Sequence, residues 1–260
     1  MTLDMYQIDA FASKVFDGNP AAVIPLQEWL DDTLMQKIAQ ENNLSETVFF
    51  VKEGKSYHIR WFTPNTEVDM CGHATLASAY VLFEVLGFKG DVIEFNSKSG
   101  ILKVKKEDKK YVMDFPIQTI DKCEIPKKII DAFDKTPIEC YKSMDYLVVF
   151  ENEQDILDAK VNLQLLKELD LRGVIITSKS SNYDFVCRFF APSHGIDEDP
   201  VTGSAYTQLV PFWRDKLNKN TFASKQISQR GGEVFCKLDA DRVEISGEAV
   251  KYLEGKIEVF

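Results

Sequence analysis

Four polar residues of this 260-residue sequence stand close to the start of predicted strands or helices, where their side chains could carry acid–base chemistry. Glu46 comes shortly before an apolar strand, and His73 begins an apolar segment. Asp199 and Ser204 lie together ahead of a second such segment. A carboxylate at the point where an apolar strand enters a cleft is partly shielded from water, which makes it competent to take and return a proton near neutrality. The expected catalytic residues are therefore Glu46, His73, Asp199 and Ser204.

Each of these residues also has an ordinary structural explanation. A glutamate in a loop is most often a helix cap or a solvated carboxylate, and a single histidine more often caps a helix or packs in a core. Asp199 before proline and Ser204 at a helix start are good capping residues. Local sequence alone leaves both explanations open for each of them.

No metal or cofactor site is expected. His58 and His194 have no ligand spacing with His73. The cysteines form no Cys-x-x-Cys pair, and their odd number leaves one over if the others were joined, so we expect reduced thiols and a cytoplasmic protein. They are Cys71, Cys123, Cys140, Cys187 and Cys236.

The segments that position the candidate residues repeat along the chain. Arg60-Trp61-Phe62-Thr63-Pro64 matches Arg188-Phe189-Phe190-Ala191-Pro192 at a distance of 128 positions. Gly72-His73-Ala74 matches Gly203-Ser204-Ala205 at 131 positions, so the second copy has a longer loop between the two strings. Two halves that share one order of elements are the economical explanation, and we expect a cleft between them framed by the matched segments.

Differences between the two copies separate chemistry from packing, because packing needs recur in both copies whereas a single active site need not. The differing positions, first copy then second, are Glu46 and Gly173, His73 and Ser204, and Val68 and Asp199.

The glycine at the start of each matched helix suggests how a substrate is held. The first N–H groups of a helix have no intrahelical acceptor and bind anions. We expect a small carboxylate to be gripped between Gly72 and Gly203, with Thr202 as a further binding residue. Proton transfer next to that carboxylate is the expected chemistry.

Strands outnumber helices in each half. In the first half we expect helices 31–41 and 73–86 and strands 5–11, 21–24, 47–52, 57–62, 92–96, 101–105 and 111–115.

The helix 73–86 is apolar nearly all round, which predicts a strand-rich unit wrapped around a buried helix. Its counterpart 204–217 contains Pro211, which removes a backbone donor and should kink the helix near Thr207. The boundary between the halves is expected near 116–126.

Composition excludes several classes of protein. With 31 basic and 41 acidic residues the net charge is -10, and no long Lys/Arg cluster occurs, so nucleic acid is not an expected partner. The longest apolar stretches are strand-sized, far short of the roughly 20 residues needed to cross a bilayer. The N-terminal Met-Thr-Leu-Asp-Met-Tyr lacks the basic and apolar regions of a signal peptide, so none is expected.

Four strings of the sequence are specific to one family. They are Gly18-Asn19-Pro20-Ala21-Ala22-Val23, Asn43-Leu44-Ser45-Glu46-Thr47, Phe62-Thr63-Pro64 through Cys71-Gly72-His73-Ala74-Thr75, and Glu198-Asp199-Pro200-Val201-Thr202-Gly203-Ser204-Ala205. Together they resemble the PhzF, or phenazine biosynthesis-like, family. The resemblance extends to the closing string 247–255 and so covers essentially the whole chain.

The resemblance implies an α+β protein of the diaminopimelate-epimerase fold. Two pseudo-symmetric domains, 1–116 and 117–260, would each form a barrel-like, mostly antiparallel sheet around a central helix, and the first domain could also take the C-terminal strand. A homodimer and an active site between the domains are implied as well. By the same likeness Glu46 is the acid/base, and His73, Asp199 and Ser204 assist it around the substrate. The founding activity isomerises trans-2,3-dihydro-3-hydroxyanthranilate without metal or organic cofactor.

Three functions follow for testing. The leading one is a cofactor-independent isomerase acting on a small carboxylate, and the second is a catalytically silent protein that binds a small anion in the same cleft. The third, a racemase with two cysteines, is disfavoured because Thr202 stands where the second cysteine is needed and a hydroxyl is too weak an acid. Cys71 is then interpreted as structural. Tyr206, where many members of the family carry histidine, leaves the substrate open.

Overall fold

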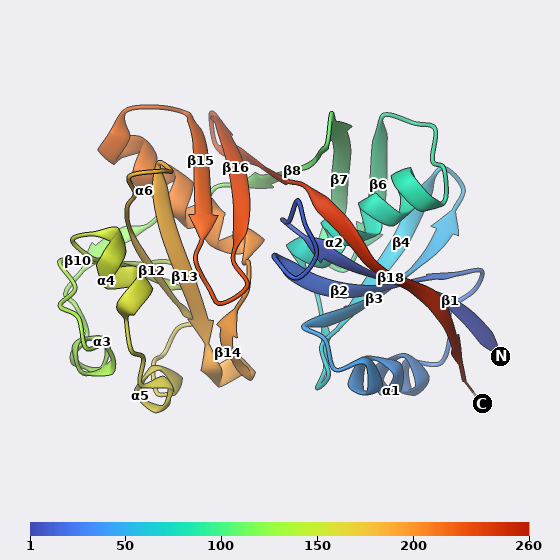
Figure 1. Cartoon of the computed structure of the whole chain (residues 1–260), viewed down its shortest axis with the longest axis horizontal. Helices are drawn as coiled ribbons and strands as arrows, with labels where there is room; N and C mark the ends of the chain where they lie inside the picture. The colour runs from blue at the N-terminus through green and yellow to red at the C-terminus, as the bar shows by residue number, and fades with distance from the viewer. Residues whose placement is uncertain (260) are drawn as a thin grey trace. The chain divides into compact units, whose positions relative to one another are not determined.

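The computed structural model describes residues 1–259 and divides the chain into two compact units. The first contains Met1–Asp114 and the segment from Ser246 onward, and the second contains Phe115–Ile245. The C-terminal strand belongs to the first unit because β18 (Ala249–Glu258) pairs antiparallel with β1 (Thr2–Ala10), which brings the two ends of the chain side by side (Figure 1).

The first unit is a mixed sheet that encloses one helix. Beyond β1 and β18, its elements in chain order are β2 (Asn19–Leu26), α1 (Asp32–Asn42), β3 (Glu46–Glu53), β4 (Ser56–Phe62), β5 (Glu67–Val68), α2 (Gly72–Tyr80), the π-helical turn η1 (Val81–Val85), β6 (Val92–Ser97), β7 (Gly100–Glu107) and β8 (Lys110–Pro116). Only the pairs β2–β3 and β4–β6 are parallel among the pairings recorded within this unit.

The second unit repeats this order. Its elements are β9 (Asp121–Cys123), α3 (Lys127–Ala132), β10 (Glu139–Lys142), β11 (Tyr146–Val149), α4 (Glu153–Asp158), α5 (Leu163–Lys167), β12 (Val174–Lys179), β13 (Phe185–Ala191), the 3-10 turn η2 (Pro192–His194), β14 (Ile196–Asp199), the 3-10 turn η3 (Gly203–Ala205), α6 (Tyr206–Leu217), β15 (Thr221–Gln226), β16 (Gly232–Asp239) and β17 (Arg242–Gly247).

Strand pairing confirms the duplication read from the sequence. The run β2 parallel to β3, β3 antiparallel to β4, and β4 parallel to β6 recurs as β11 parallel to β12, β12 antiparallel to β13, and β13 parallel to β15. The register agrees residue by residue, since Thr47 pairs with Phe62 and Val174 pairs with Phe190. Glu46 and Gly173, each one residue earlier, therefore hold equivalent positions.

An ion pair that the sequence analysis did not identify is duplicated as well. Arg60 donates from Nε and Nη2 to both carboxylate oxygens of Glu67, and Arg188 binds Glu198 in the same two-pronged way. Each guanidinium also lies over a phenylalanine ring, at 5.2 Å from the centroid of Phe62 in the first copy. The pairs link the strand before each matched loop to the strand after it.

The enclosed helices are as expected, with two local differences. Residues 73–79 of α2 are all buried, and the helix then widens so that Leu86 N–H donates to the Val81 carbonyl. In the second copy the turn η3 precedes α6, so the helix begins at Tyr206. Pro211 cannot donate to the Thr207 carbonyl, which instead accepts a hydrogen bond from Gln118 N–H at 3.0 Å.

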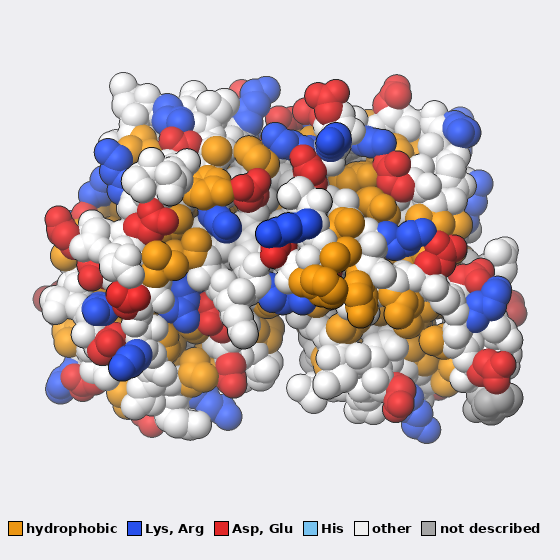
Figure 2. Space-filling view, viewed as in Figure 1, with side chains coloured by type: hydrophobic (Ala, Val, Ile, Leu, Met, Phe, Trp, Pro, Cys, Tyr) orange, Lys and Arg blue, Asp and Glu red, His pale blue; other side chains and the backbone are white. Residues whose placement is uncertain are grey.

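No helix among residues 1–259 is long and apolar enough to cross a membrane. Acidic and basic side chains are interspersed over the face that Figure 2 shows.

Candidate active site

Glu46 is the first residue of β3, and the chain reaches it through a tight exit from α1. Asn43 caps α1 in a left-handed conformation with φ of 49°, and its N–H donates to the Ala39 carbonyl. Asparagine tolerates this conformation well, so the helix ends there and the strand starts three residues later. Glu46 then pairs beside Ala21 of the parallel strand β2 and is 8% exposed.

His73 lies in the first turn of α2, which packs against β1, β2 and β3 of the same unit. Cys71 is the N-terminal cap residue of this helix, and its carbonyl accepts hydrogen bonds from the N–H and hydroxyl of Thr75. The first turn therefore holds His73 with its side chain 6% exposed.

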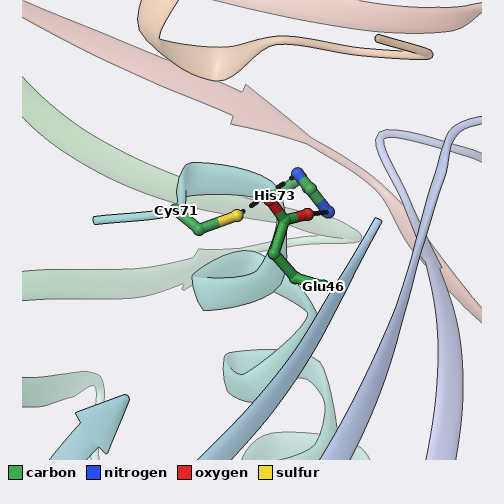
Figure 3. Close-up of side chains that lie close together, drawn as sticks. All are labelled: Glu46, Cys71 and His73. Atoms are coloured by element: carbon green, nitrogen blue, oxygen red, sulfur yellow. Dashed lines mark hydrogen bonds and ion pairs between the residues drawn. The ribbon is translucent and has the colours of Figure 1, made fainter. Parts of the chain in front are cut away.

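The carboxylate and the imidazole form a close pair, as Figure 3 shows. Glu46 Oε2 lies 2.9 Å from His73 Nε2, although the angles do not meet hydrogen-bond criteria and both atoms are buried. The other ring nitrogen, Nδ1, lies 3.4 Å from Cys71 Sγ and 3.2 Å from Asn19 Nδ2. Each nitrogen of the ring thus has a different neighbour.

Asn19 reaches the ring because of the glycine before it. Gly18 has φ of 69°, and a Cβ there would lie 2.2 Å from the Ala10 carbonyl oxygen, so no other residue fits this turn. Asn19 is fully buried at the start of β2.

Burial and charge act in opposite directions on His73. Burial lowers its pKa, but Cys71 and Glu46 outweigh burial, and the pKa lies well above the ordinary value of 6.5. Burial, followed by the charge of Glu46, raises the pKa of Cys71 to about 11. Because that thiol is protonated at neutral pH, we assign the raised pKa of His73 to the Glu46 carboxylate. The imidazole of His73 therefore keeps its proton beside the Glu46 carboxylate at neutral pH.

The same three side chains are a possible metal-binding group. Ligand atoms of Glu46, Cys71 and His73 lie within 4.8 Å of one another, the one such group of three or more among residues 1–259. The spacing of the histidines does not predict this group, because only one of the three residues is a histidine. Glu46 comes from the strand β3, and Cys71 stands two positions before His73. The ring of His73 lies between the other two side chains, with Cys71 Sγ beside Nδ1 and Glu46 Oε2 beside Nε2.

The second unit contains four of the other predicted residues, and Gly72 begins α2 of the first unit. Thr202 donates its hydroxyl to Asp199 Oδ2 at 2.5 Å, and both side chains are buried. Gln226, fully buried on β15, accepts from Thr202 N–H at 2.9 Å and donates to the Asp199 carbonyl at 2.7 Å. Gly203 and Ser204 follow directly in the turn η3. Gln226 therefore fixes the loop that carries Asp199.

Comparison with known proteins decides the family. The model of the phenazine biosynthesis-like protein family, PhzC-PhzF, matches residues 8–255. The chain belongs to the PhzF family. An uncharacterised isomerase of Pseudomonas aeruginosa is 47% identical over 260 residues, and the alignment covers the whole of both chains. The crystal structure of a PhzF-family protein from Enterococcus faecalis is 43% identical, covers both chains completely and superposes with a TM-score of 0.98.

A more distant structure supports the fold class. A hydroxyproline epimerase from Agrobacterium vitis, 8% identical, matches with a TM-score of 0.63 over 98% of this chain and 92% of its own. This likeness confirms the expected α+β epimerase-like fold. The isomerase name of the bacterial relative supports an isomerase or epimerase function for this member of the PhzF family.

Sequence reasoning missed three residues of the site in this PhzF-family chain. The sequence predicts a structural Cys71, and its sulfur lies beside the ring of His73. Asn19 has no predicted role, although its position directly after Gly18 is a signal for a fixed turn. Gln226 carried no signal, because only the fold brings β15 beside the Asp199 loop.

Proposed function

We propose that this chain is an isomerase that moves a proton between carbon atoms of a small carboxylate substrate, with Glu46 as the general acid/base and without metal or organic cofactor. The observation that carries the proposal is the buried Glu46–His73 pair at 2.9 Å. A carboxylate shielded from water and paired with an imidazole can remove a proton from an activated carbon and return it elsewhere.

His73 has a supporting role in this reaction. Its ring holds positive charge beside Glu46 and can offset negative charge that develops on the substrate when a carbon is deprotonated. Cys71 Sγ lies 3.4 Å from the opposite nitrogen, Nδ1, and can accept its N–H, which orients the ring. The thiol of Cys71 serves as a neutral neighbour, since a thiol with a pKa of about 11 is a poor base at neutral pH.

We further propose that the second unit completes the site. Asp199 and Ser204 would assist proton transfer, while Gly72, Thr202 and Gly203 would bind the substrate carboxylate. Support for this part comes from the match of both strings to the family pattern and from the fixed Asp199–Thr202 loop. A homodimer in the cytoplasm is part of the same proposal.

The experiment is deuterium uptake from D₂O. Cyclic β,γ-unsaturated and hydroxy acids, and fractions of a metabolite extract, are incubated with the wild-type chain and examined by mass spectrometry for label at carbon. We expect label with the wild type and with Glu53→Gln, a control on the exposed end of the same strand, and little with Glu46→Gln.

The same samples separate the competing function. A ligand that binds equally well to wild type and Glu46→Gln, with no label and no turnover in any fraction, would show an anion-binding protein instead.

A further inference from the structure

Two cysteines of the second unit face each other across neighbouring strands. Cys123 ends the short strand β9, and Cys140 lies on β10, which pairs antiparallel with it. The register makes Cys123 and Cys140 direct partners. Residues directly opposite in such a pair have Cβ atoms about 4.5–5.5 Å apart on the same face of the sheet. A disulfide needs Cα atoms about 4.4–6.8 Å apart, a range that paired positions satisfy, and Cβ atoms about 3.5–4.5 Å apart, so a small approach of the two residues closes the bridge.

Burial shows that both sulfurs point to the same side. Cys140 is 1% exposed and belongs to the core cluster that includes Ile129 and Val148. Cys123 is partly buried and packs against that same cluster. The thiol of Cys123 is thus accessible to small reagents, while that of Cys140 is buried in the core.

We propose that Cys123 and Cys140 form an oxidisable dithiol site that a small-molecule disulfide converts into an intramolecular disulfide bond. The site belongs to the second unit and is independent of the proton-transfer chemistry.

The reaction proceeds in two exchanges. The Cys123 thiolate attacks one sulfur of the reagent R–S–S–R, forms Cys123–S–S–R and expels one RS⁻, which takes up a proton. Cys140 then loses its proton to water and attacks the Cys123 sulfur, and the second RS⁻ leaves. Two protein thiols are oxidised by two electrons, and one R–S–S–R is reduced to two RSH.

The environment of Cys140 sets the order of these steps. Burial, and after it the neighbouring Cys123, raises the pKa of Cys140. The more accessible Cys123 therefore reacts first, and closure of the ring is the slower step, which is faster at higher pH because it needs the Cys140 thiolate.

A disulfide here would tie down an otherwise weakly held strand. β9 pairs with β10 over three residues only, and the closed loop contains α3. Cross-linking the loop 123–140 restricts the unfolded chain, which predicts a rise of several degrees in the thermal midpoint.

The two other cysteines of the second unit provide controls. Cys187 pairs with Thr177 and Gln226, and Cys236 pairs with Phe222, so neither has a cysteine opposite to it. Both are buried.

The test uses the full chain and oxidised glutathione, followed by alkylation, proteolysis without reduction and mass spectrometry. We expect a cross-linked peptide pair containing positions 123 and 140, lighter by two hydrogen atoms and separated again by dithiothreitol. Cys140→Ser should stop at a glutathione adduct on Cys123, whereas Cys236→Ser should cross-link like the wild type.

Three results overturn the proposal. They are a stable glutathione adduct on Cys123 of the wild type, a bridge between any other two cysteines, and no reaction at Cys123. The decisive reading comes from the wild type, so it does not depend on whether a variant folds. Circular dichroism of each variant checks that its fold is retained.

Discussion

Gly173 occupies in the second unit the position that Glu46 occupies in the first, and the structure shows why no side chain is found there. A Cβ at Gly173 would lie 2.7 Å from both the Phe189 Cζ and the Phe190 carbonyl oxygen. The carbonyl belongs to the paired strand β13 and cannot turn away as a flexible side chain can. Gly173→Ala should therefore lower the free energy of unfolding by about 1–3 kcal/mol, the cost of overpacking a filled site.

Urea unfolding followed by circular dichroism measures this effect, as a lower midpoint at an unchanged denaturant slope. Gly255→Ala is the matched control, because a Cβ there meets only Leu253 Cδ2 at 3.7 Å. We expect that control to stay within about 0.5 kcal/mol of the wild type. Equal stability of Gly173→Ala and Gly255→Ala would refute the packing explanation for the missing second carboxylate.

Two further predictions concern charge. Glu46→Gln should lower the pKa of His73, because the carboxylate that favours the imidazolium is removed. Titration of the ring followed by ¹H–¹⁵N NMR measures this pKa. An unchanged pKa would contradict the assignment of the shift to Glu46. Arg60, by its hydrogen bonds above all, holds the pKa of Glu67 at about 2, below the ordinary 4.5. The pair stabilises the fold fully above pH 4.5 and loses that contribution as the pH falls toward 2. Glu67→Gln should therefore cost about 1–3 kcal/mol at pH 7 and progressively less in that acid range, whereas a cost independent of pH would argue against the ion pair.

Much of the fold could be predicted because the two halves of the sequence repeat the same order of elements. The strings that begin at Arg60 and Arg188 show that the two copies share one order of elements, and strand pairing gives Glu46 and Gly173 equivalent positions in the two units. The buried character of α2 followed from an apolar pattern with no polar face. The strand order could be predicted because it is repeated, and the burial of α2 because its apolar pattern lies within one segment.

The features that could not be predicted depend on side-chain contacts and local backbone geometry that the pattern of residue types does not show. The spacing of Arg60 and Glu67 does not show that the guanidinium donates two hydrogen bonds to the carboxylate across a pair of strands. The widening of the helix at Val81 depends on how its last turn packs, which the apolar pattern leaves open. Cys71 was set aside on the identity of Thr202, although its contact with His73 is a matter of geometry within one helix turn.

The proposed role of Glu46 in proton transfer is tested most directly by the rate of deuterium incorporation at substrate carbon in D₂O, measured for Glu46→Gln beside Glu53→Gln. Glu53→Gln is expected to label the substrate at the wild-type rate, while Glu46→Gln, with its fold intact by circular dichroism, is expected to be slower by about a hundredfold or more. Equal labelling by the two variants would contradict that role.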